Sequence, residues 1–220
     1  MTSCSRCEGA GWEPVELDGR RRVRRCVCWL QANPASVANL PDYFKTATMA
    51  NLQPTAGVAA AVPAANRWLK GAHDLYLEGP VGVGKSRLAS SLANEAVSLG
   101  ASAAFFDVSD LLDRARAFEF GDGTNPIPQA RSVDILVLDD VGSGEKASNY
   151  TLRVLLGLYN HRLANSRRTI LTSNLGLDSL SQWLQDDRLS SRIVGSAEVV
   201  VMSGDDYRLA SPKPWKVPHG

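Results

Sequence analysis

A phosphate-binding loop constrains this chain more than any other feature. Residues 79–86 read Gly-Pro-Val-Gly-Val-Gly-Lys-Ser, which is the complete pattern of such a loop. Glycines at 79 and 84 allow the backbone to curl around a phosphate with its N–H groups pointing inward. Lys85 would reach the outer phosphates of a nucleoside triphosphate, and the Ser86 hydroxyl would bind Mg²⁺. We predict that the nucleotide contacts Gly79, Pro80, Val81, Gly82, Val83, Gly84, Lys85, Ser86 and Arg87.

The flanks of the loop have the expected periodicities. Residues 73–78 contain a short apolar run typical of a strand. Apolar residues then recur at helical spacing from Leu88 to Val97, and Gly100 ends the pattern. The loop should therefore connect a strand to a helix whose N-terminus faces the anion. A glycine-rich turn that binds nothing is the alternative.

A second acidic motif completes the predicted site. Residues 133–138 form a continuous apolar run, typical of a buried parallel strand, and Asp139 and Asp140 follow it. Asp139 would hold Mg²⁺ together with Ser86, and Asp140 would polarise the attacking water. The alternative is a core strand that ends in two exposed acids.

Two further segments carry polar groups suited to phosphate chemistry. Thr172-Ser173-Asn174 follows a strand pattern, and the Asn174 amide could hydrogen-bond both the γ-phosphate and the lytic water. Arg188 and Arg192 lie one helical turn apart, so both guanidiniums could reach a phosphate. A solvated amphipathic helix is the alternative for this segment.

The order of the patterns predicts an α/β fold: a parallel sheet covered by helices on both faces. Helices are expected near 58–69 and 149–163, and strands at 169–172 and 199–202. Prolines should interrupt long elements between residues 31 and 66, so residues 30–52 are predicted to be a connector. These prolines are Pro34, Pro41, Pro54 and Pro63. Residues 121–128 are expected to form a flexible surface loop.

All four cysteines lie within the first 28 residues, as Cys4-x-x-Cys7 and Cys26-x-Cys28. Four thiolates suit tetrahedral Zn²⁺, and so short a segment cannot bury enough apolar surface to fold without help. Asp18-Gly19 between the pairs is a hairpin-turn signal. The arginines of this predicted zinc hairpin are Arg20, Arg21, Arg22, Arg24 and Arg25. Four reduced, unliganded thiols are the alternative, and a redox role finds less support.

Length and composition limit the remaining possibilities. A chain of 220 residues has room for one α/β domain and a small appendage. We predict a zinc module over 1–30, a linker over 31–52 and the nucleotide-binding domain over 53–220. The net charge of +1 means that any nucleic-acid binding must come from local patches. The sequence has no membrane-spanning run and no signal peptide, so we expect a cytoplasmic protein without a membrane partner.

These motifs together resemble the AAA+ ATPases of the DnaC/DnaI helicase-loader and IstB group. The resemblance rests on residues 79–86, Leu138–Gly142, Thr172–Asn174 and Asp187–Arg192, in that order. It implies a P-loop AAA+ (ASCE) core without a full lid domain, because too little chain follows Asn174 for one. It further implies that Arg192, and with it Arg188, enters the ATP site of a neighbouring subunit in a homo-oligomer. The ending Gly204-Asp-Asp-Tyr207-Arg208 is similar to that of the loaders, which makes Arg208 a second sensor.

The resemblance also implies a function and partners. It points to an ATPase, dependent on ATP and Mg²⁺, that loads a replicative DnaB-type helicase onto single-stranded DNA. The cysteine segment is similar to the zinc module of many loader-like proteins and would contact the helicase. Loaders bind single-stranded DNA through segments that correspond here to Arg114, Arg116, Phe118, Ser148 and Tyr150. An ordinary helix surface is the alternative for the first three.

Two rival functions remain open. The first is an IstB-like transposition helper, which has nearly the same core but serves a transposase. The second is a DNA- or protein-binding module in which the nucleotide stabilises the fold without being hydrolysed. A small-molecule kinase finds no support, because no arginine-rich lid is evident.

Overall fold

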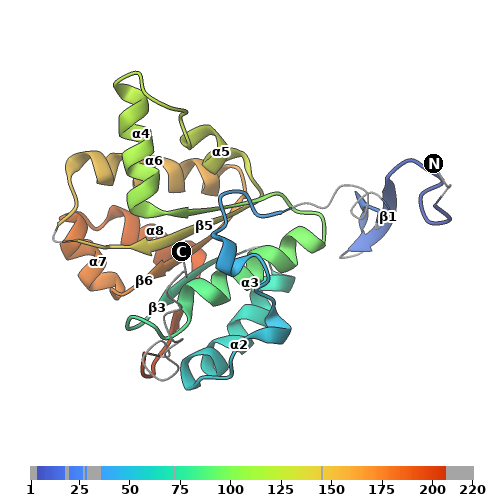
Figure 1. Cartoon of the computed structure of the whole chain (residues 1–220), viewed down its shortest axis with the longest axis horizontal. Helices are drawn as coiled ribbons and strands as arrows, with labels where there is room; N and C mark the ends of the chain where they lie inside the picture. The colour runs from blue at the N-terminus through green and yellow to red at the C-terminus, as the bar shows by residue number, and fades with distance from the viewer. Residues whose placement is uncertain are drawn as a thin grey trace, which may run out of the picture.

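The computed structural model describes residues 4–17, 20–26, 28, 36–71, 73–144 and 146–206. It consists of a small N-terminal hairpin and a larger domain built around a sheet (Figure 1). The predicted Asp18-Gly19 turn and the predicted second sensor Arg208 lie outside the described residues.

The domain is organised by a five-stranded sheet in which every neighbouring pair of strands is parallel. The strand order is β4-β5-β6-β3-β7, so β3 lies between β6 and β7. The strands are β3 (Asp74–Glu78), β4 (Ala103–Asp107), β5 (Ile135–Val141), β6 (Arg168–Ser173) and β7 (Ala197–Val201). The predicted parallel sheet is confirmed.

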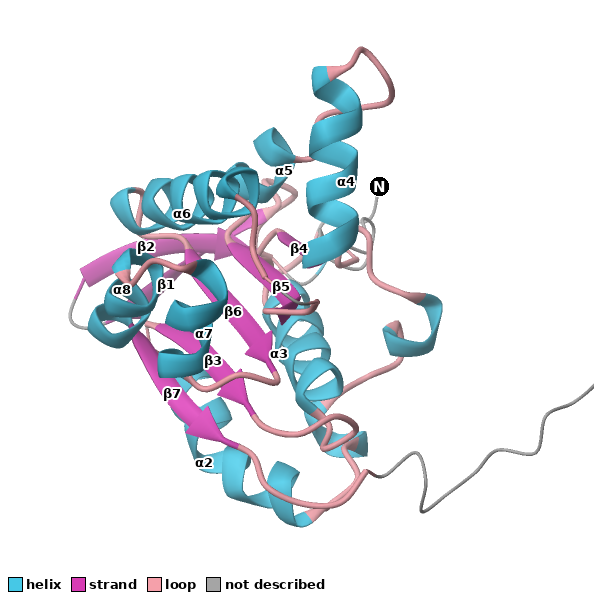
Figure 2. Ribbon diagram, turned by 90° about the vertical axis from the view of Figure 1, so that its left-hand side faces the viewer, coloured by secondary structure: helices cyan, strands magenta, loops and turns pink. Residues whose placement is uncertain are grey.

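Helices cover both faces of this sheet (Figure 2). One face packs against α2 (Ala56–Lys70) and α3 (Lys85–Ser98). The other face packs against α4, α6, α7 and α8 and a buried residue of α5. The bounds of these five helices are α4 Val108–Glu119, α5 Ile127–Ser132, α6 Asn149–Ala164, α7 Leu177–Leu184 and α8 Arg188–Ser196.

Side-chain alternation along the strands divides the core into two layers. In β3, Leu75 and Leu77 join the cluster beside α2 and α3, while Tyr76 joins the cluster on the other face. In β5, Val137 and Leu138 divide in the same way. Each fully buried side chain of this kind contributes about 1.5–3 kcal/mol of transfer free energy. Burial on both faces explains why the strands read as continuous apolar runs.

Two details differ from the sequence-based expectation. Pro63 lies inside α2 rather than interrupting it. The proline lacks the N–H that would bond the carbonyl of Ala59, and Ala59 is exposed, so water can satisfy that carbonyl. Ile127 and Pro128, expected in a loop, begin α5, because the Asn125 side chain accepts the N–H of Ile127 at 3.0 Å.

The expected connector contributes three buried side chains to the core within its described residues. Val37, Leu40 and Phe44 belong to the cluster beside α2 and α3. Ala38 forms a parallel bridge with Ala104 on β4. Two 3₁₀ turns follow, η1 (Asp42–Phe44) and η2 (Met49–Asn51). This segment therefore packs on the sheet domain as an integral part of it.

The N-terminal hairpin pairs β1 (Trp12–Leu17) with β2 (Arg20–Arg25) in antiparallel register. Neither core cluster includes a residue before Val37, so the hairpin lies outside the core of the sheet domain. Within the described ranges, no helix combines the length and the apolar character needed to cross a membrane.

Candidate functional site

The phosphate-binding loop connects β3 to α3, as the sequence predicts. Gly84 is the N-cap of α3 and has φ +105°, a conformation that glycine adopts without strain. The Lys85 side chain is buried, and its Nζ donates to the carbonyl oxygens of Gly79 at 2.7 Å and Pro80 at 2.8 Å. A third bond runs from Nζ to Oδ1 of Asn174 at 2.8 Å. The ammonium is thus held at the loop, where phosphate oxygens would be stronger partners.

Asp139 lies next to the loop and is hydrogen-bonded through β6. Oγ1 of Thr172 donates to Oδ1 of Asp139 at 2.6 Å and accepts the backbone N–H of Asp140 at 3.0 Å. Burial raises the pKa of Asp139, and hydrogen bonds from Thr172 and Ser86 oppose that rise. The structure therefore brings together Ser86 and Asp139, the two residues predicted to hold Mg²⁺. A hydroxyl and a carboxylate are oxygen ligands of the kind that Mg²⁺ prefers.

Asp140 is connected to Lys85 through one amide. Nδ2 of Asn174 donates to Oδ1 of Asp140 at 3.2 Å, while Oδ1 of the same amide accepts from Lys85. Asp140 has φ +58°, and the pairing of β5 with β6 shifts register between Leu138 and Val141. This irregularity places the two successive acids at the end of β5 beside Asn174 at the end of β6.

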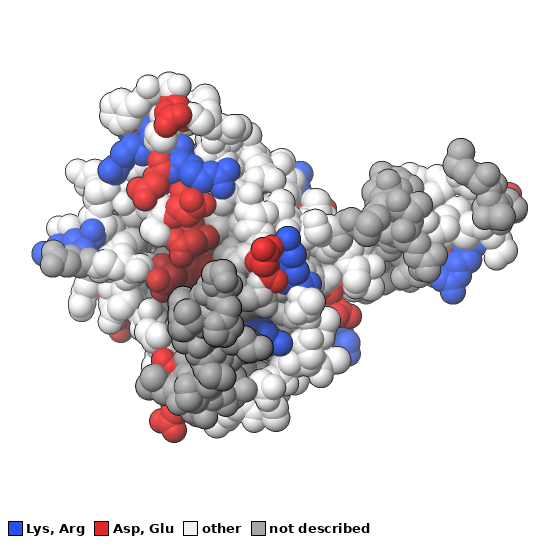
Figure 3. Space-filling view, viewed as in Figure 1, with Lys and Arg blue, Asp and Glu red and all other residues white. Residues whose placement is uncertain are grey.

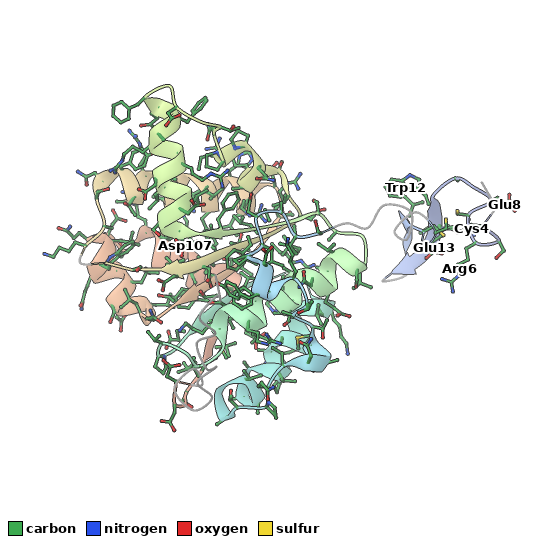
Figure 4. The ribbon with its side chains drawn as sticks, in the orientation of Figure 1. Cys4, Arg6, Glu8, Trp12, Glu13 and Asp107 are labelled. Atoms are coloured by element: carbon green, nitrogen blue, oxygen red, sulfur yellow. The ribbon has the colours of Figure 1, made fainter. Side chains whose placement is uncertain are left out.

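These groups open onto a cavity of about 640 Å³. Predicted residues that line it are Val81, Gly82, Val83, Gly84, Lys85, Ser86, Arg87, Asp139, Asp140 and Asn174. Asp107, which the sequence did not single out, also lines it and pairs in register with Asp139. Asp107, labelled in Figure 4, lies within the column of acidic side chains that Figure 3 shows in red. Asp107 also caps α4, accepting the N–H of Ser109 at 2.9 Å.

Part of the cavity is formed by the segment expected to be a connector and by the residues that follow it. The lining residues are Tyr43, Phe44 and Leu52 of that segment, and Gln53, Thr55 and Val58 after it. Asn94 on α3 fastens this segment by donating to the carbonyl oxygens of Phe44 at 3.1 Å and Ala47 at 2.9 Å. Arg87 donates to the backbone oxygen of Asn51 at 3.3 Å. No local motif marks these residues, so sequence reasoning missed them.

The two arginines of α8 differ in their surroundings. The guanidinium of Arg188 forms hydrogen bonds of 2.8–3.0 Å with both carboxylate oxygens of Asp186. Arg192 is exposed, and its side chain makes no ion pair within the described part of the chain. Neither arginine lines the cavity.

The predicted DNA-binding residues do not form one cluster. Arg116 and Arg153 stack on Tyr150, with guanidinium carbons 4.9 Å and 5.4 Å from the ring centroid. Arg114 instead lies over the Phe106 ring at 5.6 Å and pairs with Asp110 at 3.5 Å. Positions two apart on a helix face different directions, which explains the separation.

The other two residues predicted to bind DNA, Ser148 and Phe118, are close in sequence to Tyr150 and Arg116. Ser148 caps α6 by accepting the N–H of Thr151 at 3.1 Å. Phe118 is 45% exposed, and Phe120, which the sequence analysis did not name, is 84% exposed. Exposed aromatic rings on a segment that also carries arginines suit base stacking combined with phosphate contact.

The four cysteines form a cluster in which all four sulfur atoms lie within 4.8 Å of one another. The Sγ atoms of Cys4 and Cys26 are 3.6 Å apart, and those of Cys7 and Cys28 are 3.3 Å apart. Tetrahedral Zn²⁺ with Zn–S bonds of about 2.3 Å requires sulfur separations of about 3.8 Å. The N–H of Gly11 also donates to Sγ of Cys7 at 3.3 Å. The donor set and its spacing fit a zinc ion. Figure 4 labels Cys4 in the hairpin.

Thiol ionisation in this cluster is strongly perturbed. A hydrogen bond from the backbone of Arg6 lowers the pKa of Cys4 to about 7. Interaction with Cys7 raises the pKa of Cys28 to about 12. Four thiolates so close together repel one another, and a bound divalent cation would offset that repulsion.

Comparison with known proteins identifies the family. A family model described as IstB-like ATP binding protein matches residues 32–213. The chain is 38% identical over 117 residues to a putative ATP-binding protein of insertion sequence IS1162 from Pseudomonas fluorescens, covering 52% of this chain and 49% of that protein. It is 24% identical over 133 residues to the replicative helicase loader DnaC of Escherichia coli strain K12, covering 59% and 54%. The chain thus spans about half the length of these relatives.

Solved structures share the fold. The crystal structure of the DnaC helicase loader superposes with a TM-score of 0.66 at 23% identity, covering 74% of this chain and all of that chain. AMPPCP-bound DnaA from Aquifex aeolicus gives a TM-score of 0.65 at 24% identity, covering 74% and 52%. The family match extends over most of the sequence and includes the loop, the Asp139-Asp140 pair and Asn174. The chain therefore belongs to the IstB-like ATP-binding protein family, within the DnaC/IstB group of AAA+ proteins.

Proposed function

We propose that this chain is an ATPase that loads a replicative, DnaB-type helicase onto single-stranded DNA. The observation that carries the ATPase assignment is the hydrogen-bonded series Lys85–Asn174–Asp140 beside the Thr172–Asp139 pair. These groups combine phosphate binding and water activation at one cavity. The likeness to DnaC supports the loader assignment.

Each residue of the series has a chemical role. Lys85 and the loop N–H groups bind the outer phosphates, and Ser86 and Asp139 hold Mg²⁺, which neutralises phosphate charge when bound. Asp140 orients and polarises the attacking water. Asn174 contacts both Lys85 and Asp140. The presence or absence of a γ-phosphate at Lys85 can therefore change the position of the Asp140 carboxylate through this amide.

Two variants test the ATPase assignment. Lys85→Ala should abolish nucleotide binding, whereas Asp140→Asn should bind ATP but stop hydrolysis, because Asp140 acts on the water rather than on bound phosphate. Binding of a fluorescent ATP analogue and release of inorganic phosphate measure the two effects. Hydrolysis by Asp140→Asn at the parental rate would contradict the role of Asp140. A parent chain that binds ATP without turnover would favour the non-hydrolysing module.

The arginine that completes the site comes, in this proposal, from a neighbouring subunit. Arg192 is exposed and unpaired within the described residues, whereas Asp186 already holds Arg188. A guanidinium supplied in trans raises turnover by about 10³–10⁵ in related phosphoryl transfers. The subunits would then associate head to tail, as a ring or an open helix.

A mixing experiment tests this arrangement. Arg192→Ala and Lys85→Ala should each be inactive, and their mixture should regain part of the ATPase activity. Arg188→Ala is the control on the same helix and should lose less activity. The arrangement is wrong if folded, associating variants show no recovery on mixing.

Single-stranded DNA would bind at the Tyr150 surface, which we define as Arg116, Phe118, Tyr150 and Arg153. Two guanidiniums around an aromatic ring supply both charge and stacking. Arg153→Ala should weaken binding of a labelled oligonucleotide and flatten its salt dependence. Lys70→Ala, on the opposite face of the sheet, is the control and should bind like the parent. Equal loss in both variants would contradict the assignment.

The hairpin would hold one Zn²⁺ through Cys4, Cys7, Cys26 and Cys28 and would contact the helicase. The clustering of the four sulfur atoms within 4.8 Å of one another supports the metal. Coordination supplies the folding free energy that a segment of this size lacks.

A transposition helper is the second candidate, favoured by the 38% identity to an insertion-sequence protein. The two functions differ in the partner. The purified chain, with ATP and single-stranded DNA, should bind and load the replicative helicase of its own organism. Binding to a transposase from the same organism, with no helicase binding, would decide for the second candidate.

A further inference from the structure

The segment that follows the last strand lies directly against the phosphate-binding loop. Met202 continues the pairing of β7, and its N–H donates to the carbonyl of Glu78 at 2.7 Å. Residues 203–206 then run alongside the loop, and Figure 2 shows the loops after β3 and β7 adjacent below the sheet. We call residues 202–206 the closing segment.

Three glycines permit this close approach. A side chain at Gly57 on α2 would collide with the carbonyl of Ser203, and one at Gly79 would collide with the carbonyl of Met202. The tightest contact is at Gly82, φ +76°, where a Cβ would overlap the carboxylate of Asp206. The Asp206 carboxylate therefore rests against the loop that binds phosphate.

From this contact we propose that the closing segment is an autoinhibitory clasp which ATP binding displaces. The inference rests on the proposed ATPase function and adds a regulation to the same site. A carboxylate and a nucleoside triphosphate carry like charges, so occupation of the loop raises the electrostatic energy of Asp206 in its seated position. The two equilibria are linked. If bound nucleotide weakens the contact between the closing segment and the loop by a given factor, the seated segment weakens nucleotide binding by the same factor.

A neighbouring residue provides a matched control. Asp205 carries the same charge one position earlier and is exposed, whereas Asp206 is partly buried against the loop. Asp206→Asn removes the charge with almost no change of shape. It should bind a fluorescent ATP analogue in the presence of Mg²⁺ about three- to tenfold more tightly than the parent, an effect typical of a partly solvated charge pair. Asp205→Asn should stay within about twofold, because its charge is screened by solvent.

Hydrogen exchange gives a second readout. In the parent, adding ATP should speed amide exchange in the peptide that contains residues 203–206, because its seat on the loop is lost. Equal affinity of the parent and both variants would overturn the clasp, as would slower exchange of this peptide with ATP. A parent and variants that all fail to bind nucleotide would overturn the ATPase proposal itself, so the two failures are distinguishable.

Discussion

The hairpin and the sheet domain are stabilised in different ways. In the sheet domain, apolar side chains of every strand pack against helices on both faces. In the hairpin, among the residues whose burial the structure describes, the buried ones are Cys7, Gly11, Glu13 and Cys26, which supply little apolar surface. A two-stranded ribbon is marginally stable at best by itself. One region therefore folds by burial of apolar surface, whereas the other requires a crosslink, which the cysteine cluster can supply through a metal.

Metal removal should show the largest difference between the two regions. Chelation, or Cys26→Ser, should unfold the hairpin, since structural zinc supplies about 10–16 kcal/mol in comparable small modules. Thiol titration checks this directly, because all four cysteines of the chain lie in the hairpin. Four unreactive thiols should become reactive on chelation, while the melting temperature of the sheet domain stays constant. Protein purified without chelator that contains no zinc would contradict the comparison.

A core substitution should destabilise the sheet domain and leave the hairpin unaffected. Leu136 is fully buried in the central part of the sheet, so Leu136→Ala should lower the free energy of unfolding of the domain by about 2–5 kcal/mol. Zinc content should not change. Leu99→Ala is the matched control, because Leu99 is 60% exposed and its truncation leaves no cavity. Urea unfolding measures both variants, and equal loss of stability in the two would contradict the assignment of Leu136 to the core.

Mild acid should change the stability of the two regions in opposite directions. Burial raises the pKa of Asp74, although hydrogen bonds from Thr169 and Tyr159 oppose the rise. A raised pKa means that the folded state binds the proton more tightly than the unfolded state. The stability contribution of Asp74 is therefore fully present below the ordinary carboxyl pKa and is lost as pH rises through the raised pKa of the folded state. The thiolates of the hairpin, in contrast, release zinc as they protonate.

The Asp74 effect can be isolated by a difference measurement. As pH falls from about 7 to about 4, the ordinary pKa of an aspartate carboxyl, the nucleotide-free parent should gain stability relative to Asp74→Asn, because only the parent has this group to protonate. Thermal unfolding at the two pH values measures the change. A difference between parent and variant that does not depend on pH would show that Asp74 has the same pKa folded and unfolded.

The sequence predicts those parts of the fold and site that are encoded by contiguous motifs. The loop, the Asp139-Asp140 pair and Asn174 each follow a strand pattern, and a parallel sheet gathers such positions at one edge. Their convergence could therefore be anticipated without knowing any contact. The same holds for the cysteine cluster, since two close pairs joined by a hairpin bring four sulfur atoms together.

The remainder depends on packing between segments distant in sequence. Tyr43 and Gln53 reach the cavity because Asn94 and Arg87 fasten an aperiodic segment onto α3. The difference between Arg188 and Arg192 depends on Asp186, which precedes the helix and has no periodic pattern. Arg153 joins Arg116 only through the ring of Tyr150, from another helix. Contacts of this kind leave no local signal.

The smallest effect should be that of the hairpin on nucleotide binding. The cavity is lined by residues from Tyr43 to Asn174, and neither core cluster includes a residue before Val37, so no part of the described site depends on the cysteine cluster. Cys26→Ser should therefore change the affinity for a fluorescent ATP analogue by less than about twofold, even though its hairpin is unfolded. Helicase binding should be lost in the same variant, because the proposed contact surface is in the hairpin. Loss of both activities would show that the hairpin and the nucleotide site are coupled, and the comparison between two independently stabilised regions would then fail.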